Sequence, residues 1–205
     1  MPKIRRTYAL TAVLALGCLC LTAPAPAVGA SGPSANRLVA KAPIAAPKGA
    51  SDLCARHPWA CATANRPPRP TAQMLQIARL INRDVNARTR NLSDNQQYGR
   101  EEYWALPTAR GGDCEDFALE KKRRLIEAGL PPQALLIATV LDRSRNPHAV
   151  LVMRTDQGDY VLDNLRSGLS RWHLTGYSFL RMQDPKAPAR WQAILAGGIF
   201  SKTGT

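Results

Sequence analysis

Residues 111–116 read Gly-Gly-Asp-Cys-Glu-Asp, and they stand where a loop pattern changes to a helical one. Asp113 can serve as the N-cap of a helix from Cys114 to Ala128, and Gly129 with the following Pro-Pro pair ends that helix. Cys114 therefore lies in the first turn, between carboxylates, and the two preceding glycines let another backbone approach closely. The stretch predicts a cysteine presented at a helix N-terminus.

Outside this stretch the hydrophobic period predicts one more helix and a set of strands. Apolar residues at helical spacing predict an amphipathic helix over about residues 71–90. Apolar runs of strand type cover residues 134–141, 148–155 and 160–165, and residues 156–159 form a hairpin connection. The order predicts an α+β fold, with the cysteine's helix packed on an antiparallel sheet.

The same patterns assign several side chains to the core. In the second helix the expected buried residues are Phe117, Ala118, Leu125 and Ile126, and residues 121–124 are expected to face solvent. Residues 91–112 are expected to be mostly loop. Four aromatic residues after Ser167 are expected to cover the sheet: Trp172, Tyr177, Phe179 and Trp191.

Three residues in the order Cys, His, Asp form a candidate catalytic set. Cys114 begins the helix, His148 begins the second strand pattern, and Asp163 lies in the third. A thiol is a good nucleophile only as the thiolate, which a helix N-terminus favours. An imidazole can take the proton, and a carboxylate behind it fixes the tautomer and stabilises the imidazolium. The alternative is that Cys114 is a small buried hydrophobe and the other two are structural.

The simplest register of the predicted hairpin does not join His148 and Asp163. A three-residue loop over residues 156–158 pairs Thr155 with Asp159. His148 and Asp163 are then three rungs apart, roughly 10 Å, with their side chains on opposite faces. A bulge or a different turn is needed to bring them together.

The carboxylates of Asp113, Glu115 and Asp116 oppose a thiolate at Cys114, because like charge raises a thiol pKa. Bound Ca²⁺ would neutralise them, since it takes hard carboxylate oxygens at flexible geometry. The alternative is that Asp113 caps the helix and the other two acids complement its dipole.

Residues 1–30 have the organisation of a secretory signal peptide. A basic start precedes an apolar run over residues 8–21, which is followed by small residues and proline. Cleavage is expected after Ala27 or Ala30, so the mature protein is expected in the periplasm or outside the cell. The alternatives are an uncleaved anchor and a lipoprotein processed at Cys18.

Export changes the counts of cysteine and charge. Cleavage after Ala30 removes three basic residues and no acidic one, which lowers the formal charge from +13 to +10. Of the remaining cysteines, Cys54 and Cys61 are seven residues apart and can close a small disulfide loop in an oxidising compartment. Cys114 is then an unpaired thiol, which in an exported protein is either reactive or buried.

The positive charge suggests an anionic surface or partner, although a solvated basic surface accounts for it more simply. Nucleic acid is not expected as a partner, because the basic residues are scattered and the aromatic residues few. Residues 31–50 hold few large apolar residues and are expected to be a flexible leader. A single domain is expected over residues 51–205.

Four blocks of sequence resemble the bacterial transglutaminase-like cysteine proteinases, a family that includes the LapG-type periplasmic proteases. The blocks are Gly-Asp-Cys-Glu-Asp-Phe-Ala-Leu at residues 112–119, Gly-Leu-Pro at 129–131, His-Ala-Val-Leu at 148–151 and Gly-Asp-Tyr-Val-Leu-Asp-Asn at 158–164. The resemblance covers about residues 51–185, and the combination of blocks is specific.

The resemblance implies a papain/transglutaminase-like fold and a catalytic set. The family's catalytic positions match three residues of this chain: Cys114, His148 and Asp163. Asp113 and Glu115 match calcium-binding positions of the LapG-type members, and Asp116 is a candidate further ligand. LapG-type members cleave large surface adhesins and are sequestered by a membrane receptor for a cyclic dinucleotide. A protein substrate, an adhesin and a regulatory receptor are therefore the implied partners.

An exported cysteine endopeptidase is thus the function expected from the sequence. A transglutaminase-type acyl transfer, in which an amine replaces the hydrolytic water, is one alternative. A non-catalytic periplasmic binding module on the same fold is a second. A basic protein that docks on anionic envelope material is a third.

Overall fold

The computed structural model describes residues 36–65 and 71–201. The predicted signal peptide and the first residues of the predicted leader lie outside the described residues. Within the described part, no helix has both the length and the apolar character needed to cross a membrane.

The described residues form four α-helices and seven strands. The helices are α1 (Leu53–Arg56), α2 (Ala72–Arg88), α3 (Asp94–Tyr98) and α4 (Cys114–Glu127). The strands are β1 (Ala42–Ile44), β2 (Leu135–Leu141), β3 (Pro147–Thr155), β4 (Gly158–Leu162), β5 (Ser170–Arg171), β6 (Ser178–Asp184) and β7 (Ala187–Ala196). Short 3-10 helices are η1 (Lys48–Ala50), η2 (Pro58–Cys61), η3 (Pro132–Ala134), η4 (Trp172–Leu174) and η5 (Gly198–Phe200).

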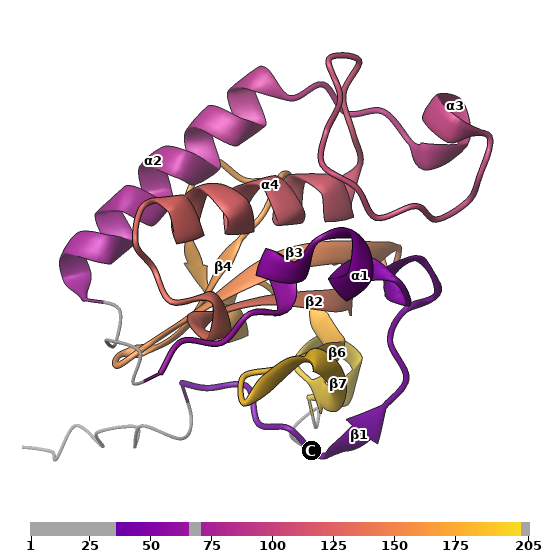
Figure 1. Cartoon of the computed structure of the whole chain (residues 1–205). Coiled ribbons are helices and arrows are strands. Elements are labelled where there is room, and N and C mark those ends of the chain that lie inside the picture. The colour runs from indigo at the N-terminus through magenta and orange to yellow at the C-terminus, as the bar shows by residue number, and fades with distance from the viewer. Residues whose placement is uncertain (1–35, 66–70, 202–205) are drawn as a thin grey trace, which may run out of the picture. The chain divides into compact units, whose positions relative to one another are not determined.

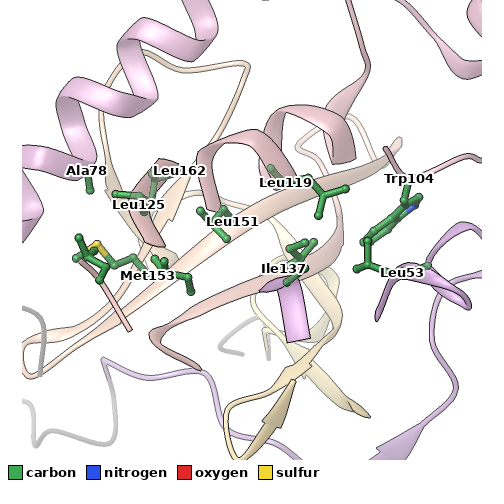
Figure 2. Packing of buried hydrophobic residues seen from close by; sticks show 14 of the residues in the cluster. Leu53, Ala78, Trp104, Leu119, Leu125, Ile137, Leu151, Met153 and Leu162 are labelled. Carbon is green, nitrogen blue, oxygen red and sulfur yellow. The ribbon is translucent and has the colours of Figure 1, made fainter. Parts of the chain in front are cut away.

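All strand pairs are antiparallel, in the order β1-β7-β6-β2-β3-β4-β5, and α4 lies on the sheet with α2 beside it (Figure 1). Leu119 and Leu125 of α4 belong to one hydrophobic cluster with Ile137 and Leu151 of the sheet, and all four are fully buried (Figure 2). Burying one such side chain contributes about 1.5–3 kcal/mol. This packing fixes the first turn of α4 against β3, and the predicted α+β fold is confirmed.

The C-terminal part of the sheet differs from the sequence-based expectation. Phe179 and Trp191 were expected to cover the sheet, but they lie in β6 and β7 and belong to it. Polar residues interrupt both strands, so neither shows a continuous apolar run. Gln183 is nevertheless fully buried, because its side chain bonds the backbone of Ile137 and Pro188. Trp172, by contrast, packs on Phe179 from outside the strands, as expected.

The side of α4 that was expected to be solvated is partly buried. Lys121 and Lys122 are 1% and 0% exposed. Lys122 Nζ donates to Gln183 Oε1 at 2.7 Å, and burial lowers the pKa of Lys122 to about 7. For Lys122 the prediction was wrong because the sheet extends to β6, and Gln183 of that strand accepts the hydrogen bond of Lys122 in the core.

The predicted flexible leader is part of the folded unit over residues 36–50. Leu38 is buried against the sheet, β1 pairs with β7, and Arg181 Nη1 donates to the carbonyl oxygen of Ala45 at 2.9 Å. This segment is held by the backbone hydrogen bonds of β1 and by one buried apolar side chain, Leu38. It therefore folds although its sequence contains few large apolar residues. The domain boundary expected at residue 51 is therefore too late.

The β3–β4 hairpin has a tighter turn than expected. Thr155 pairs with Gly158, so the turn holds two residues and not three. A one-residue change of register moves every side chain of a strand to the other face. In the observed register Asp163, which follows β4, lies diagonal to His148 on the same face. The expectation that the two lie on opposite faces is wrong for this reason.

The predicted disulfide between Cys54 and Cys61 is present in the structure, with a Cα–Cα distance of 5.5 Å. It joins α1 to η2 and closes the small loop expected from the spacing. Cys114 is the free cysteine of the described residues.

Gly158→Ala should destabilise the protein by about 1–3 kcal/mol, because a side chain is strained at positive φ and would clash. Gly158 has φ +119°, and a Cβ there would lie 2.5 Å from the carbonyl oxygen of Asn36. Gly168→Ala is the matched control, since a Cβ at Gly168 meets nothing within 4 Å. Urea unfolding of both variants measures the difference, and equal losses would contradict the explanation.

Lys122→Met should flatten the pH dependence of stability between neutral pH and about pH 9. The pKa of Lys122 is lowered from 10.5 to about 7 in the folded protein, so across this window the unfolded chain binds more protons. Wild-type stability therefore rises with pH there, by up to about 1.4 kcal/mol per pH unit for this group. Urea unfolding in a Cys114→Ala background, which avoids thiol exchange, measures both slopes. Parallel slopes would contradict the prediction.

Candidate active site

Cys114 is the first residue of α4 and is half-buried. Its thiol Sγ donates to Glu115 Oε2 at 3.1 Å. The first helical hydrogen bond in this turn runs from Phe117 N–H to Asp113 O. The N–H groups of the three residues between them therefore have no partner within the helix. Cys114 lies at the positive end of the α4 dipole, as its sequence position predicted.

His148 and Asp163 form a buried pair. His148 Nε2 lies 2.9 Å from Asp163 Oδ1, and the two side chains are 7% and 2% exposed. His148 is held in the ladder of β3, opposite Val140 of β2. Because Nε2 faces Asp163, Nδ1 is the nitrogen that remains for proton exchange with another group. The structure thus brings together the two residues that the sequence could not join by spacing.

Tyr177 is a member of this constellation that the sequence analysis missed. Its hydroxyl donates to Asp163 Oδ2 at 2.6 Å, and its ring packs edge-on against the His148 ring at 5.9 Å between centroids. Tyr177 was read as a covering aromatic residue, and no local motif marked it. Only the tertiary structure reveals this contact, because Tyr177 precedes β6 and Asp163 follows β4, and these two strands are not neighbours in the sheet.

Asp163 remains a carboxylate although it is buried. Burial would raise its pKa, but hydrogen bonds from His148, Tyr177 and the Leu165 N–H outweigh burial and lower the pKa below 3.8. An ionised Asp163 can fix the tautomer of His148 and stabilise its protonated form.

Cys114 and His148 both line two hollows of the surface. One has a volume of about 320 Å³ and includes Pro47, Lys48 and Trp104 among its lining residues. The other has a volume of about 380 Å³, and most of its lining residues are polar residues. The pair therefore lies where the two hollows meet, and a chain bound through both would pass the thiol.

The thiol of Cys114 is in an environment that opposes ionisation. Burial raises its pKa well above 9.0, and the carboxylates of Glu115 and Asp113 raise it further, while the backbone amide of Ala149 acts in the opposite direction. The electrostatic conflict expected from the sequence is present in the structure. Any use of the thiolate requires that the negative charge of these acids be compensated.

Three acidic side chains gather next to Cys114: Asp94, Asp113 and Glu115. One ligand atom from each lies within 4.8 Å of the other two. Burial and the charge of Asp113 raise the pKa of Glu115, and burial raises the pKa of Asp94 to about 6. Within the described part of the chain, Asp94 Oδ1 and Asp113 Oδ1 are buried and accept no hydrogen bond from protein. This donor set fits a hard cation that prefers oxygen ligands.

The cluster differs from the predicted metal set by one residue. Asp94, on α3, is a member that the sequence analysis missed, because it is 19 residues from Asp113 in the chain. Asp116 was a candidate ligand but is not in the cluster. Its Oδ1 accepts from the Ala105 N–H at 2.9 Å, and its carboxyl group packs against Gly112, where a Cβ would lie 2.6 Å from Oδ2.

Asp113 does not use its side chain to cap α4. Its Oδ2 accepts instead from the N–H of Asp94 at 3.1 Å, which ties the start of α3 to the start of α4. The capping explanation for Asp113 is therefore wrong, and its carboxylate is directed toward the acidic cluster.

Tyr177→Phe should lower the free energy of unfolding by about 1.5–3 kcal/mol at neutral pH, because it removes a hydrogen bond to a buried carboxylate. The pKa of Asp163 is lowered, so this stabilisation is present above pH 3.8 and is lost as the pH falls through the lowered pKa. Urea unfolding measures the loss. In an Asp163→Ala background the same substitution should change the free energy of unfolding little. An equally large loss in that background would contradict this explanation.

A family model described as bacterial transglutaminase-like cysteine proteinase matches residues 40–198. Among solved structures, Legionella pneumophila LapG is similar at 24% identity and a TM-score of 0.50, over 62% of this chain and 70% of that one. Its calcium-bound form matches at 19% identity and a TM-score of 0.46, over 65% and 80%. Its EGTA-treated form matches at 19% identity and 0.43, over 69% and 83%. Curated protein sequences give no match.

The family match spans most of the folded unit, from the edge strand β1 to η5, and includes every residue of the site described above. The similarity to LapG supports the same fold. On these grounds, this chain belongs to the bacterial transglutaminase-like cysteine proteinase family and is a cysteine peptidase.

Proposed function

We propose that this protein is an exported endopeptidase that cleaves a cell-surface protein with a Cys114–His148–Asp163 triad and is supported by bound calcium. The buried contact between His148 Nε2 and Asp163 Oδ1 carries the proposal, because it leaves Nδ1 free in a cleft that also holds Cys114. A buried, ionised carboxylate behind an imidazole has a cost in stability that a pair of apolar side chains would avoid.

The chemistry follows from these positions. His148 Nδ1 takes the thiol proton, and Cys114 Sγ attacks the scissile carbonyl carbon. The protonated His148, stabilised by Asp163, gives the proton to the leaving amine, which departs and leaves a thioester. Water, deprotonated by His148, then hydrolyses the thioester and restores the thiol.

The negative oxygen of the tetrahedral intermediate needs hydrogen-bond donors. The N–H of Cys114 itself has no partner within α4 and lies at the positive end of the helix dipole. It is the donor that we assign to this oxyanion.

We assign calcium to Asp94, Asp113 and Glu115. Their ligand atoms converge within 4.8 Å, and two of their buried oxygens accept no protein hydrogen bond in the described residues. When bound, Ca²⁺ supplies positive charge that compensates these carboxylates. With that compensation, the main electrostatic obstacle to a thiolate at Cys114 is reduced, and α3 is held against the start of α4.

The proposed location and partners rest on the sequence. The signal-peptide pattern of residues 1–30 supports export to the periplasm or the outside of the cell. The disulfide between Cys54 and Cys61 is compatible with an oxidising compartment. Because the family is one of proteinases, the substrate is a protein. We propose a surface adhesin for this role and a membrane-bound receptor as the regulator.

Cys114→Ala should abolish cleavage of candidate surface proteins, since the nucleophile is removed. Purified wild type and variant are incubated with surface proteins of the source cell, and new chain termini are identified by mass spectrometry. Asp163→Ala should lower the rate by about 10³- to 10⁴-fold, because His148 loses its orienting partner. Amide cross-links in place of new termini would instead establish acyl transfer, and cleavage by Cys114→Ala would exclude the triad.

Asp94→Asn should weaken calcium binding by at least about tenfold, because it removes one of three carboxylates from the site. Asp156→Asn is the matched control, since Asp156 is an exposed acid in the β3–β4 turn. Calorimetric titration of chelator-treated protein with Ca²⁺ measures both affinities. Equal affinities of the two variants would show that the ion does not use this cluster.

A further inference from the structure

Asp163 lies on a segment that the sheet does not hold. β4 ends at Leu162, β5 begins at Ser170, and in the described structure no strand pairing involves the residues between them. His148, by contrast, is fixed within the β2–β3 ladder. The 2.9 Å contact between the two side chains therefore depends on whatever holds the backbone of Asp163.

Two asparagines of α2 hold this segment. Asn86 Nδ2 donates to the carbonyl oxygens of Asp163 at 2.8 Å and Arg166 at 3.0 Å. Asn82, one helical turn earlier, donates through Nδ2 to the carbonyl oxygens of Arg166 at 2.9 Å and Ser167 at 3.1 Å. Together they satisfy three backbone carbonyl groups that have no ladder to bond. We call this pair the asparagine clamp.

The clamp departs from the apolar pattern of its own helix. Ala78 and Val85 are buried on α2, and Asn82 is fully buried among them. The side-chain oxygens Oδ1 of both asparagines are buried and accept no hydrogen bond from the described protein groups. A buried acceptor without a protein donor costs about 1–3 kcal/mol, which an apolar side chain would avoid. What these positions supply is therefore two side-chain amide groups that donate four hydrogen bonds to the segment after β4.

We propose that Asn86 is a positioning residue that fixes Asp163 for its contact with His148. Asn86 bonds the backbone of Asp163 directly, whereas Asn82 bonds only the backbone that follows. Neither asparagine lines the two hollows that contain Cys114, so neither is placed to touch the reacting atoms. The inference rests on the role proposed for Asp163 in catalysis.

The test compares Asn86→Ala with Asn82→Ala. Each removes two hydrogen bonds and one side-chain amide from the same face of α2, so their losses in melting temperature should be similar. The proton between His148 Nε2 and Asp163 Oδ1 is observed as a downfield resonance in ¹⁵N-histidine-labelled protein and is assigned with His148→Gln. We expect this resonance in wild type and in Asn82→Ala, and its loss or a marked upfield shift in Asn86→Ala.

The two variants should differ in kcat in the same way as they differ in the resonance. In the cleavage assay with a surface protein, Asn86→Ala should lower kcat by about 10- to 100-fold and change KM by less than about twofold, because the geometry of the triad is disturbed and the cleft is not. Asn82→Ala should keep kcat within about threefold of wild type. An unchanged resonance and kcat in Asn86→Ala, or equal losses in both variants, would overturn the proposal.

The proposed function and the proposed role of the asparagine clamp can be tested separately. If wild type cleaves no protein but the resonance responds to Asn86→Ala as described, the proposed function fails and the clamp stands. If wild type cleaves and Asn86→Ala cleaves equally fast with its resonance intact, the clamp fails and the function stands.

Discussion

The two-residue turn between β3 and β4 is the constraint on which the site depends. It sets the register in which Thr155 faces Gly158, and that register puts Asp163 on the same face of the sheet as His148. One additional residue in the pairing would reverse the orientation. Gly158 makes the turn available, because its φ of +119° is one that other residues rarely adopt. Packing of α4 on β3 then brings the cysteine to the same place.

The site concentrates unfavourable electrostatics in a small volume. A thiol, three clustered carboxylates and a further buried acid, Asp116, lie within the first turns of α3 and α4. Burial raises the pKa of Asp116 to about 7. Such an arrangement is costly for folding and is typical of functional sites, where perturbed ionisation serves chemistry or ion binding. Under the proposed function, the same concentration links occupancy of the acidic cluster by Ca²⁺ to the reactivity of the thiol.

The sequence was most informative where structure is local. The helix that starts at Cys114, the strand that carries His148 and the Cys54–Cys61 disulfide follow from patterns within short windows, and all three are present. Prediction failed where the outcome depends on distant parts of the chain. Lys122 is polar and reads as solvated, but Gln183 of β6 meets it in the core.

The same contrast between local patterns and distant contacts holds for the residues of the site. Cys114, His148 and Asp163 could be named from the sequence, because motifs mark them. Tyr177 and Asp94 could not, since each acts through a contact with residues far along the chain. Asp116 lies outside the acidic cluster because neighbours in sequence share a helix turn but point in different directions. Proximity in sequence indicates which residues are near a site, whereas side-chain direction depends on the helix and on tertiary packing.

The segment before residue 51 has a practical consequence for any shortened form of this protein. Pro47 and Lys48 line the same hollow as Cys114, and Ala45 is bonded to Arg181 of β6. A truncation chosen from composition alone, at the end of the Ala- and Pro-rich region, would remove one wall of the cleft and expose the edge of β7. If such a fragment were inactive, the cause would be the missing wall of the cleft and not a defect in the chemistry of the thiol.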